Sequence, residues 1–102
     1  MNEQDWRTLL ADVDEEYIEQ AVLWCQDIVN CLVRYTGKTQ REAEQLVASS
    51  YVPKFLNKDV GYVFHEMPYY WAMELLYARS NPQWYKDEKL WPPPSDYRAP
   101  YS

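Results

Sequence analysis

The chain has 102 residues, of which 47 % are hydrophobic and 17 % aromatic, with a net charge of −6 and only two glycines. This length predicts one domain that buries roughly 60–70 % of its unfolded surface, and the high aromatic content argues against a disordered chain. Most all-β folds need more turn glycines than this, so the composition favours helices.

The negative charge is concentrated in the first 30 residues. They hold eight acidic side chains and one basic side chain, for a net charge of −7, whereas residues 31–102 hold eight acidic and nine basic side chains, for +1. Phosphate backbones and anionic lipid surfaces repel such a segment, so we expect no direct binding of nucleic acid or membrane. The segment instead favours a basic protein partner, with a role in solubility alone as the alternative.

Compartment and redox state follow from three observations. Seven acidic side chains within residues 1–20 do not fit a secretory leader, and no run of 18 apolar residues is present to span a membrane. Cys25 and Cys31 lie six positions apart on one expected helix, about 9 Å along its axis, which is too far for a disulfide. We therefore predict a cytoplasmic protein with two reduced, buried cysteines.

Apolar residues recur every three or four positions from Trp6 to Leu32, and residues 1–36 contain neither proline nor glycine. The spacing predicts a short helix near residues 3–11 and a long helix near 14–35, with Asp12 or Asp14 as the cap of the second. One continuous helix over 3–35 is the alternative. The long helix is apolar over more than half of its circumference, which indicates a central position with neighbours on two sides.

The polar side of the long helix carries one apolar exception. Leu23 falls in the middle of this arc and is a place where a partner could dock. The polar residues of the arc are Glu16, Glu19, Gln20, Asp27, Asn30 and Arg34.

The stretch "GKT" at residues 37–39 resembles part of a phosphate-binding loop, but position 32 is leucine instead of glycine and no strand precedes it. The local chemistry fits a helix boundary better. Gly37 is expected to end the long helix in the left-handed region, and Thr39 with Glu42 forms a capping box for the next helix.

The helix that starts after Thr39 should end near residue 51, because Val52 precedes Pro53. Residues 54–65 allow either one more helical turn and a loop, or a short extended piece at 60–64. A third main helix is expected to start at Pro68 and to end at Asn81-Pro82. The order of these two capped helices looks like that of small bacterial domains.

Residues 80–102 combine five prolines with five large aromatic residues. Proline prevents regular helix there, and so many aromatic rings favour a tail that wraps over the helices, with a free proline-rich ligand as the alternative. The predicted fold is all-α, a small bundle of three main helices plus a short N-terminal helix. Residues 1–79 form the helical part and 80–102 an irregular tail of the same single domain.

No catalytic or metal-binding pattern is present above background. His65, followed by Glu66, is the single histidine, and an HExxH zinc motif would need a second histidine where Tyr69 stands. Cys25, Cys31 and His65 would still lack a fourth zinc ligand. We therefore expect no cofactor, no metal and no enzymatic activity, while an enzyme that uses His65 as acid or base is kept as an alternative.

The sequence thus favours a small acidic interaction module, an adaptor or an immunity- or antitoxin-like protein, that binds a basic partner. A homodimer through the long helix near Leu23 and Trp24 is a second alternative. The residues expected to contact the partner are Asp12, Asp14, Glu15, Glu16, Glu19, Leu23, Asp27, Trp91 and Tyr97.

Overall fold

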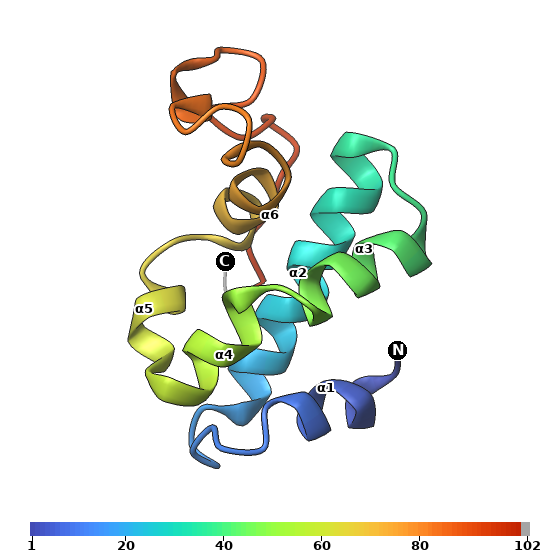
Figure 1. Cartoon of the computed structure of the whole chain (residues 1–102), viewed down its shortest axis with the longest axis vertical. Helices are drawn as coiled ribbons and strands as arrows, with labels where there is room; N and C mark the ends of the chain where they lie inside the picture. Colours follow the sequence, from blue (N-terminus) through green and yellow to red (C-terminus); the bar gives the residue numbers. More distant parts are fainter. Residues whose placement is uncertain (101–102) are drawn as a thin grey trace.

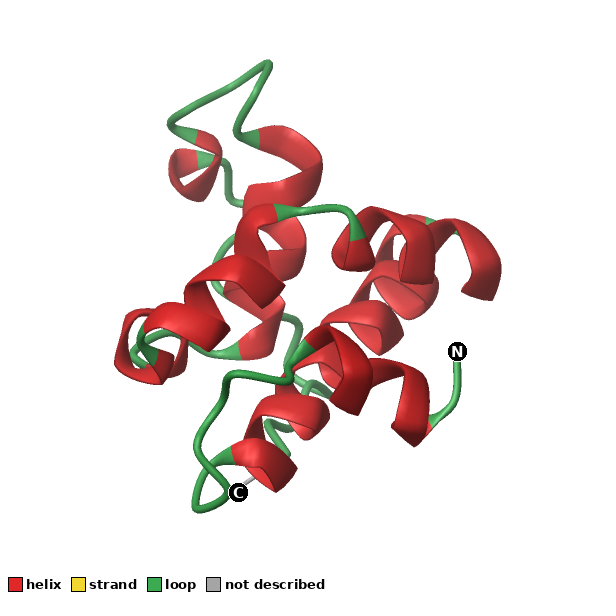
Figure 2. Ribbon diagram, turned by 60° about the horizontal axis from the view of Figure 1, so that its bottom comes forward, coloured by secondary structure: helices red, strands yellow, loops and turns green. Residues whose placement is uncertain are grey.

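A computed structural model describes residues 1–100 and shows an all-helical molecule with no strand among them (Figures 1 and 2). The all-α prediction is confirmed. No helix in this part of the chain combines the length and apolar character needed to cross a membrane. The elements are α1 (Glu3–Leu9), α2 (Ile18–Thr36), α3 (Gln40–Ala48), α4 (Tyr51–Lys58), α5 (Val60–Phe64), α6 (Pro68–Tyr77) and the 3-10 turn η1 (Trp84–Lys86).

Helix α2 is the centre of the bundle, as its wide apolar surface predicts. Helices α1, α3 and α6 all pack against it, and α4 touches it as well (Figure 1). With eight of the 21 buried hydrophobic residues in the described part of the chain, α2 supplies the largest share of the hydrophobic stabilisation of this small core. Its buried residues are Ala21, Val22, Trp24, Cys25, Ile28, Val29, Cys31 and Leu32.

The helix is interrupted between Leu9, where α1 ends, and Ile18, where α2 begins, which confirms two helices instead of one. The capping prediction for Asp12 and Asp14 is wrong, because α2 starts later, with Tyr17 as an N-cap that makes no side-chain bond. The intervening segment is held by the amide of Asn57. Its Oδ1 accepts from the Asp12 backbone N–H at 3.0 Å, and its Nδ2 donates to the carbonyl of Leu9 at 2.8 Å.

The boundary between α2 and α3 is confirmed in detail. Gly37 follows α2 with φ +75°, in the left-handed region that only glycine adopts without strain. The Glu42 backbone N–H donates to the Thr39 hydroxyl at 3.1 Å, and the Thr39 N–H donates to the Glu42 carboxylate at 2.9 Å. These two bonds satisfy N–H groups that the first turn of a helix leaves unpaired.

The predicted helix end near residue 51 is wrong. Helix α3 already ends at Ala48, and α4 starts at Tyr51 after a two-residue break. Pro53 therefore lies in the first turn of α4, where its missing N–H has no helical partner to lose. The Ser50 hydroxyl caps this helix by accepting from the Val52 N–H at 3.2 Å.

Residues 60–64 form the short helix α5 instead of an extended piece. The Asp59 carboxylate caps it by accepting from the Gly61 N–H at 3.0 Å. Helix α6 begins at Pro68, as predicted, but ends at Tyr77. It therefore stops before Asn81-Pro82, and residues 78–80 form turns.

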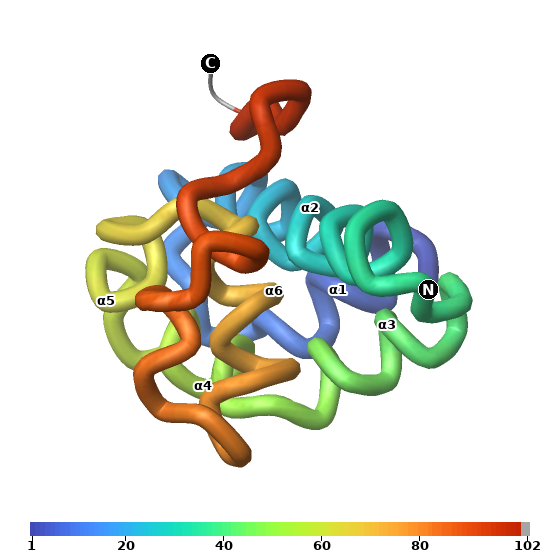
Figure 3. The backbone as a smooth tube through the Cα atoms, turned by 90° about the horizontal axis from the view of Figure 1, so that it is seen from above, coloured from blue at the N-terminus to red at the C-terminus, as the bar shows by residue number. Residues whose placement is uncertain are grey.

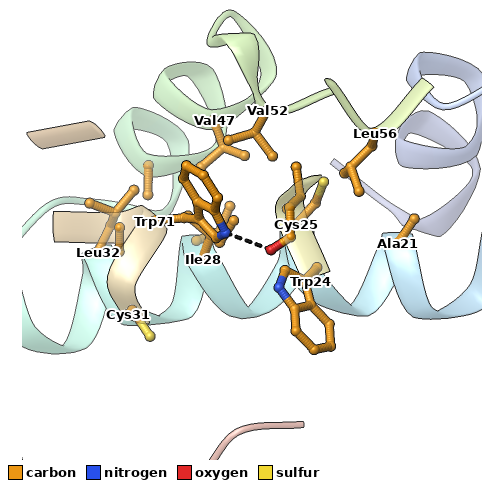
Figure 4. Packing of buried hydrophobic residues seen from close by; sticks show 14 of the residues in the cluster. Ala21, Trp24, Cys25, Ile28, Cys31, Leu32, Val47, Val52, Leu56 and Trp71 are labelled. Atoms are coloured by element: carbon orange, nitrogen blue, oxygen red, sulfur yellow. Dashed lines mark hydrogen bonds between the residues drawn. The ribbon is translucent and has the colours of Figure 1, made fainter. Parts of the chain in front are cut away.

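Tryptophan indoles connect the core to the loops around it. The Trp71 indole N–H donates to the carbonyl of Val63 at 2.8 Å (Figure 4), and the Trp24 indole N–H donates to the carbonyl of Glu66 at 3.1 Å. The first bond fixes α5 against α6, and the second fixes the α5–α6 connection against α2. A buried indole N–H needs such a partner, because an unpaired donor in the core would cost about 1–3 kcal/mol.

The tail crosses over α6 and then α2 (Figure 3). Trp84 is fully buried, and the Tyr69 hydroxyl on α6 donates to the carbonyl of Leu90 at 2.7 Å. The predicted docking of the tail is thus confirmed up to residue 100, and it does not extend freely. Tyr101, which the same prediction included, lies outside the described residues.

Candidate partner-binding surface

Five carboxylates of the N-terminal region form an exposed acidic surface. They lie on the segment between α1 and α2 and on the first turn of α2, and none of them forms an ion pair with a residue in the range 1–100. Carboxylates near a helix N-terminus are favourable, because the helix dipole is positive there. We call Asp12, Asp14, Glu15, Glu16 and Glu19 the acidic surface.

One side of the acidic surface borders a hollow of about 370 Å³ on α2, which we call the Leu23 hollow. Leu23 is 48 % exposed there, although it belongs to the helix with the largest number of buried residues among those described. Glu16 and Glu19 stand beside it, and Pro100 of the tail forms part of the wall. The structure therefore joins three of the predicted partner contacts in one place.

The other side of the acidic surface borders a larger hollow of about 510 Å³. Asp12, Asp14 and Tyr17 line it together with Lys58 and the start of α5. We call this the α4–α5 hollow. The acidic surface thus has two sides, one toward Leu23 and one toward α4 and α5.

Asp27 does not belong to the acidic surface. It is half-buried under the tail, where it accepts a hydrogen bond from the Tyr97 hydroxyl at 3.0 Å. Burial raises the pKa of the Asp27 carboxyl above its usual value, and the hydrogen bond from Tyr97 opposes this shift. Of the predicted contact residues, Asp27 and Tyr97 therefore bind each other.

A second set of polar contacts fastens the same part of the tail to the end of α2. Arg34 forms an ion pair with Asp96, and the Tyr35 hydroxyl donates to the other oxygen of that carboxylate at 3.2 Å. The Tyr35 ring also meets the ring of Tyr97 edge-on at 6.5 Å. The tail is thus held by Asp96 on Arg34 and Tyr35 and by Tyr97 on Asp27. Several such contacts together attach it more strongly than one exposed ion pair would.

Trp91 also serves the attachment of the tail. Its half-buried ring lies 6.2 Å from the Tyr69 ring, 6.1 Å from the Tyr70 ring and 5.8 Å from the Trp84 ring. These separations are typical of favourable aromatic pairs. Trp91 and Tyr97 are therefore placed away from the acidic surface, against α6 and α2.

One group of rings on α4 and α5 was not predicted from the sequence. It consists of the exposed Tyr51 and Tyr62 with the half-buried Phe55 between them, and we call it the aromatic face. The Phe55 ring lies 5.3 Å from the Tyr51 ring and 4.7 Å from the Tyr62 ring. Tyr62 is 51 % exposed, more than any other large hydrophobic side chain among the described residues. Lys54 and Lys58 on α4 are exposed to solvent next to these rings.

His65, Cys25 and Cys31, the side chains with the greatest potential reactivity, all contact hydrophobic or aromatic neighbours. The exposed His65 ring meets the rings of Tyr62 and Trp71 edge-on, at 5.8 and 6.1 Å. Burial raises the pKa of the Cys25 thiol to about 12 and raises that of Cys31 still further, so neither is a thiolate near neutral pH. Residues 1–100 contain no group of three or more histidine, cysteine, aspartate and glutamate side chains that could hold a metal ion.

No protein-family model, curated protein or solved structure matches this chain. The functional interpretation therefore depends on the chemistry of its own surfaces.

Proposed function

We propose that the protein is a small, acidic, non-catalytic interaction module that binds a basic protein partner through the acidic surface and the Leu23 hollow. The observation that carries the proposal is the position of Leu23. It is a half-exposed leucine on an otherwise well-buried helix, with Glu16 and Glu19 beside it in one hollow. An adaptor or an immunity- or antitoxin-like protein would use such a surface.

The chemistry of the hollow favours a basic amphipathic segment as the partner. An apolar side chain of the partner would cover Leu23, and lysine or arginine side chains around it would meet the carboxylates. The carboxylates lack a partner within residues 1–100, so no existing ion pair has to break. Charges of this kind raise the association rate and select the partner, while the apolar centre supplies affinity.

The test is affinity capture of the tagged protein from its host cells, followed by measurement of the dissociation constant for the captured partner. We expect Leu23→Ser to weaken binding by at least about tenfold, because it removes the apolar centre. Glu16→Gln with Glu19→Gln should weaken binding at low salt and reduce its salt dependence. Full affinity in both variants would overturn the proposal.

Matched controls change the same chemistry elsewhere on the surface. Leu9→Ser replaces another exposed leucine, and Glu3→Gln with Glu88→Gln removes two exposed carboxylates. We expect these controls to stay within about twofold of the wild-type dissociation constant. Equal losses in controls and test variants would point to a general effect of charge or stability instead of a binding surface.

A further inference from the structure

We propose that a second copy of this chain binds the aromatic face, so that the protein forms a two-fold symmetric dimer. In this dimer, Lys54 and Lys58 of each copy meet Asp12 and Asp14 of the other. The interface lies on α4, α5 and the side of the acidic surface that borders the α4–α5 hollow.

The aromatic face provides the apolar part of this interface. Tyr51 and Tyr62 are 37 % and 51 % exposed, and Phe55 lies between them in contact with both rings. The rings are held from below by Trp71, which is only 4 % exposed and lies 6.2 Å from Tyr51 and 6.0 Å from Tyr62. Rings that are already ordered lose little entropy on binding, and tyrosine is enriched in protein interfaces.

The charges around this face are complementary but unused within one copy. Lys54 and Lys58 are four positions apart on α4, exposed, and without an ion pair to any residue in 1–100. Asp12 and Asp14 are likewise unpaired across the α4–α5 hollow. A second copy can supply each set with its opposite, because it presents the same two sets.

The arrangement of the two sets fits a two-fold axis. Asp12, Asp14 and Lys58 line one hollow, and Lys54 lies one helical turn before Lys58 on α4, so the two sets are neighbours on the surface. A rotation of 180° about an axis between neighbouring complementary patches brings each patch onto its opposite in the other copy, which is an isologous interface.

The dimer goes beyond the proposed function and shares only Asp12 and Asp14 with it. Glu16, Glu19 and Leu23 line the other hollow, so each copy keeps this part of the surface for the basic partner. The two proposals can therefore fail separately. Loss of the dimer leaves the Leu23 hollow in place, and loss of partner binding leaves the aromatic face in place.

Sedimentation equilibrium of the whole chain tests the dimer at low salt, over about 1 µM to 1 mM protein. We expect a reversible shift from 12.3 kDa to twice that mass. Lys54→Glu with Lys58→Glu should raise the dissociation constant by at least about tenfold, because it places like charges opposite each other. The matched control Lys86→Glu with Lys89→Glu makes the same charge change on the tail and should leave the dimer within about twofold.

A charge exchange tests the pairing itself. Asp12→Lys with Asp14→Lys, added to Lys54→Glu with Lys58→Glu, returns the net charge to −6 and should restore the dimer to within about threefold of wild type. A chain that stays monomeric over the whole range overturns the proposal. So does a dimer that the lysine reversals leave intact, one that the exchange does not restore, or one that only Leu23→Ser removes.

The apolar part has its own pair of variants. Tyr62→Ser removes the most exposed ring of the aromatic face and should raise the dissociation constant by at least about fivefold. Tyr85→Ser removes a ring of similar exposure, 46 %, from the tail and should have no effect on the dimer. Equal effects of the two variants would overturn the assignment to the aromatic face. Far-ultraviolet circular dichroism confirms that each variant is folded.

Discussion

Trp84→Ala tests whether the tail contributes to the stability of the bundle. The Trp84 side chain is fully buried between the tail and α6. Its ring centre lies 5.3 Å from that of Tyr70 and 5.8 Å from that of Trp91, and its indole N–H donates to the Glu74 carboxylate at 2.5 Å. Removal of this ring should therefore loosen the segment around η1 from α6, while the contacts of Trp91 and Tyr97 remain.

The magnitude follows from the size of the ring. A tryptophan buries about 150–250 Å² of surface, which corresponds to about 4–6 kcal/mol at 25 cal/mol per Å² as an upper limit. The freed carboxylate of Glu74 is half-exposed and can be hydrated, so it adds little. Movement of the tail also relieves part of the cavity. We therefore expect a loss of about 3–5 kcal/mol in the free energy of unfolding.

Urea unfolding followed by far-ultraviolet circular dichroism measures this loss. The helix signal is preferred to tryptophan fluorescence, because the substitution removes one of the fluorescent side chains. The neighbouring ring Tyr85 gives a matched control, because it is 46 % exposed and its replacement by alanine should cost less than about 1 kcal/mol. A loss below about 1 kcal/mol for Trp84→Ala would show that the tail does not stabilise the bundle, and the description of its packing would be wrong.

Three further predictions concern single sites in α2 and at its end. Burial raises the pKa of Asp27, so folding favours its protonated form, and stability falls as the pH rises from the ordinary carboxyl pKa through the raised one. Asp27→Asn, which can still accept from Tyr97, should therefore gain stability relative to wild type between about pH 4 and pH 7 in urea unfolding, and a relative loss at pH 7 would contradict this. Cys25 and Cys31 should resist iodoacetamide in the native protein and react after unfolding, which mass spectrometry would show; rapid labelling of the folded chain would contradict their burial. Gly37→Ala should cost about 1 kcal/mol, because alanine is strained at φ +75°, and an unchanged urea midpoint would refute this reasoning.

The parts of the fold that sequence analysis predicted correctly depend on neighbours along the chain. The left-handed stop at Gly37, the box formed by Thr39 and Glu42, and the helix start at Pro68 each need only residues within one helical turn. Leu23 also follows from local spacing, because its place in the polar arc of α2 predicts its exposure. Such features are readable because their physical causes are local.

Errors arose where a helix boundary was misplaced. Pro53 was expected to end a helix, but it lies in the first turn of a new helix that Ser50 caps. The aromatic face was missed for a similar reason. Its signal is the four-residue spacing of Tyr51 and Phe55 on α4, which has meaning only once residues 51–58 are known to be helical.

The helical class, the end of α2, the starts of α3 and α6, the central position of α2 and the excess of negative charge before residue 30 follow from the sequence alone. Which side chains meet depends on the packing of the whole chain. It brings Tyr97 to Asp27, 70 positions away, and so removes both from the acidic surface, while it leaves Leu23 beside Glu16 and Glu19. The reason is physical: periodicity and capping report the environment within one helix, whereas a contact between distant segments depends on how the whole chain packs.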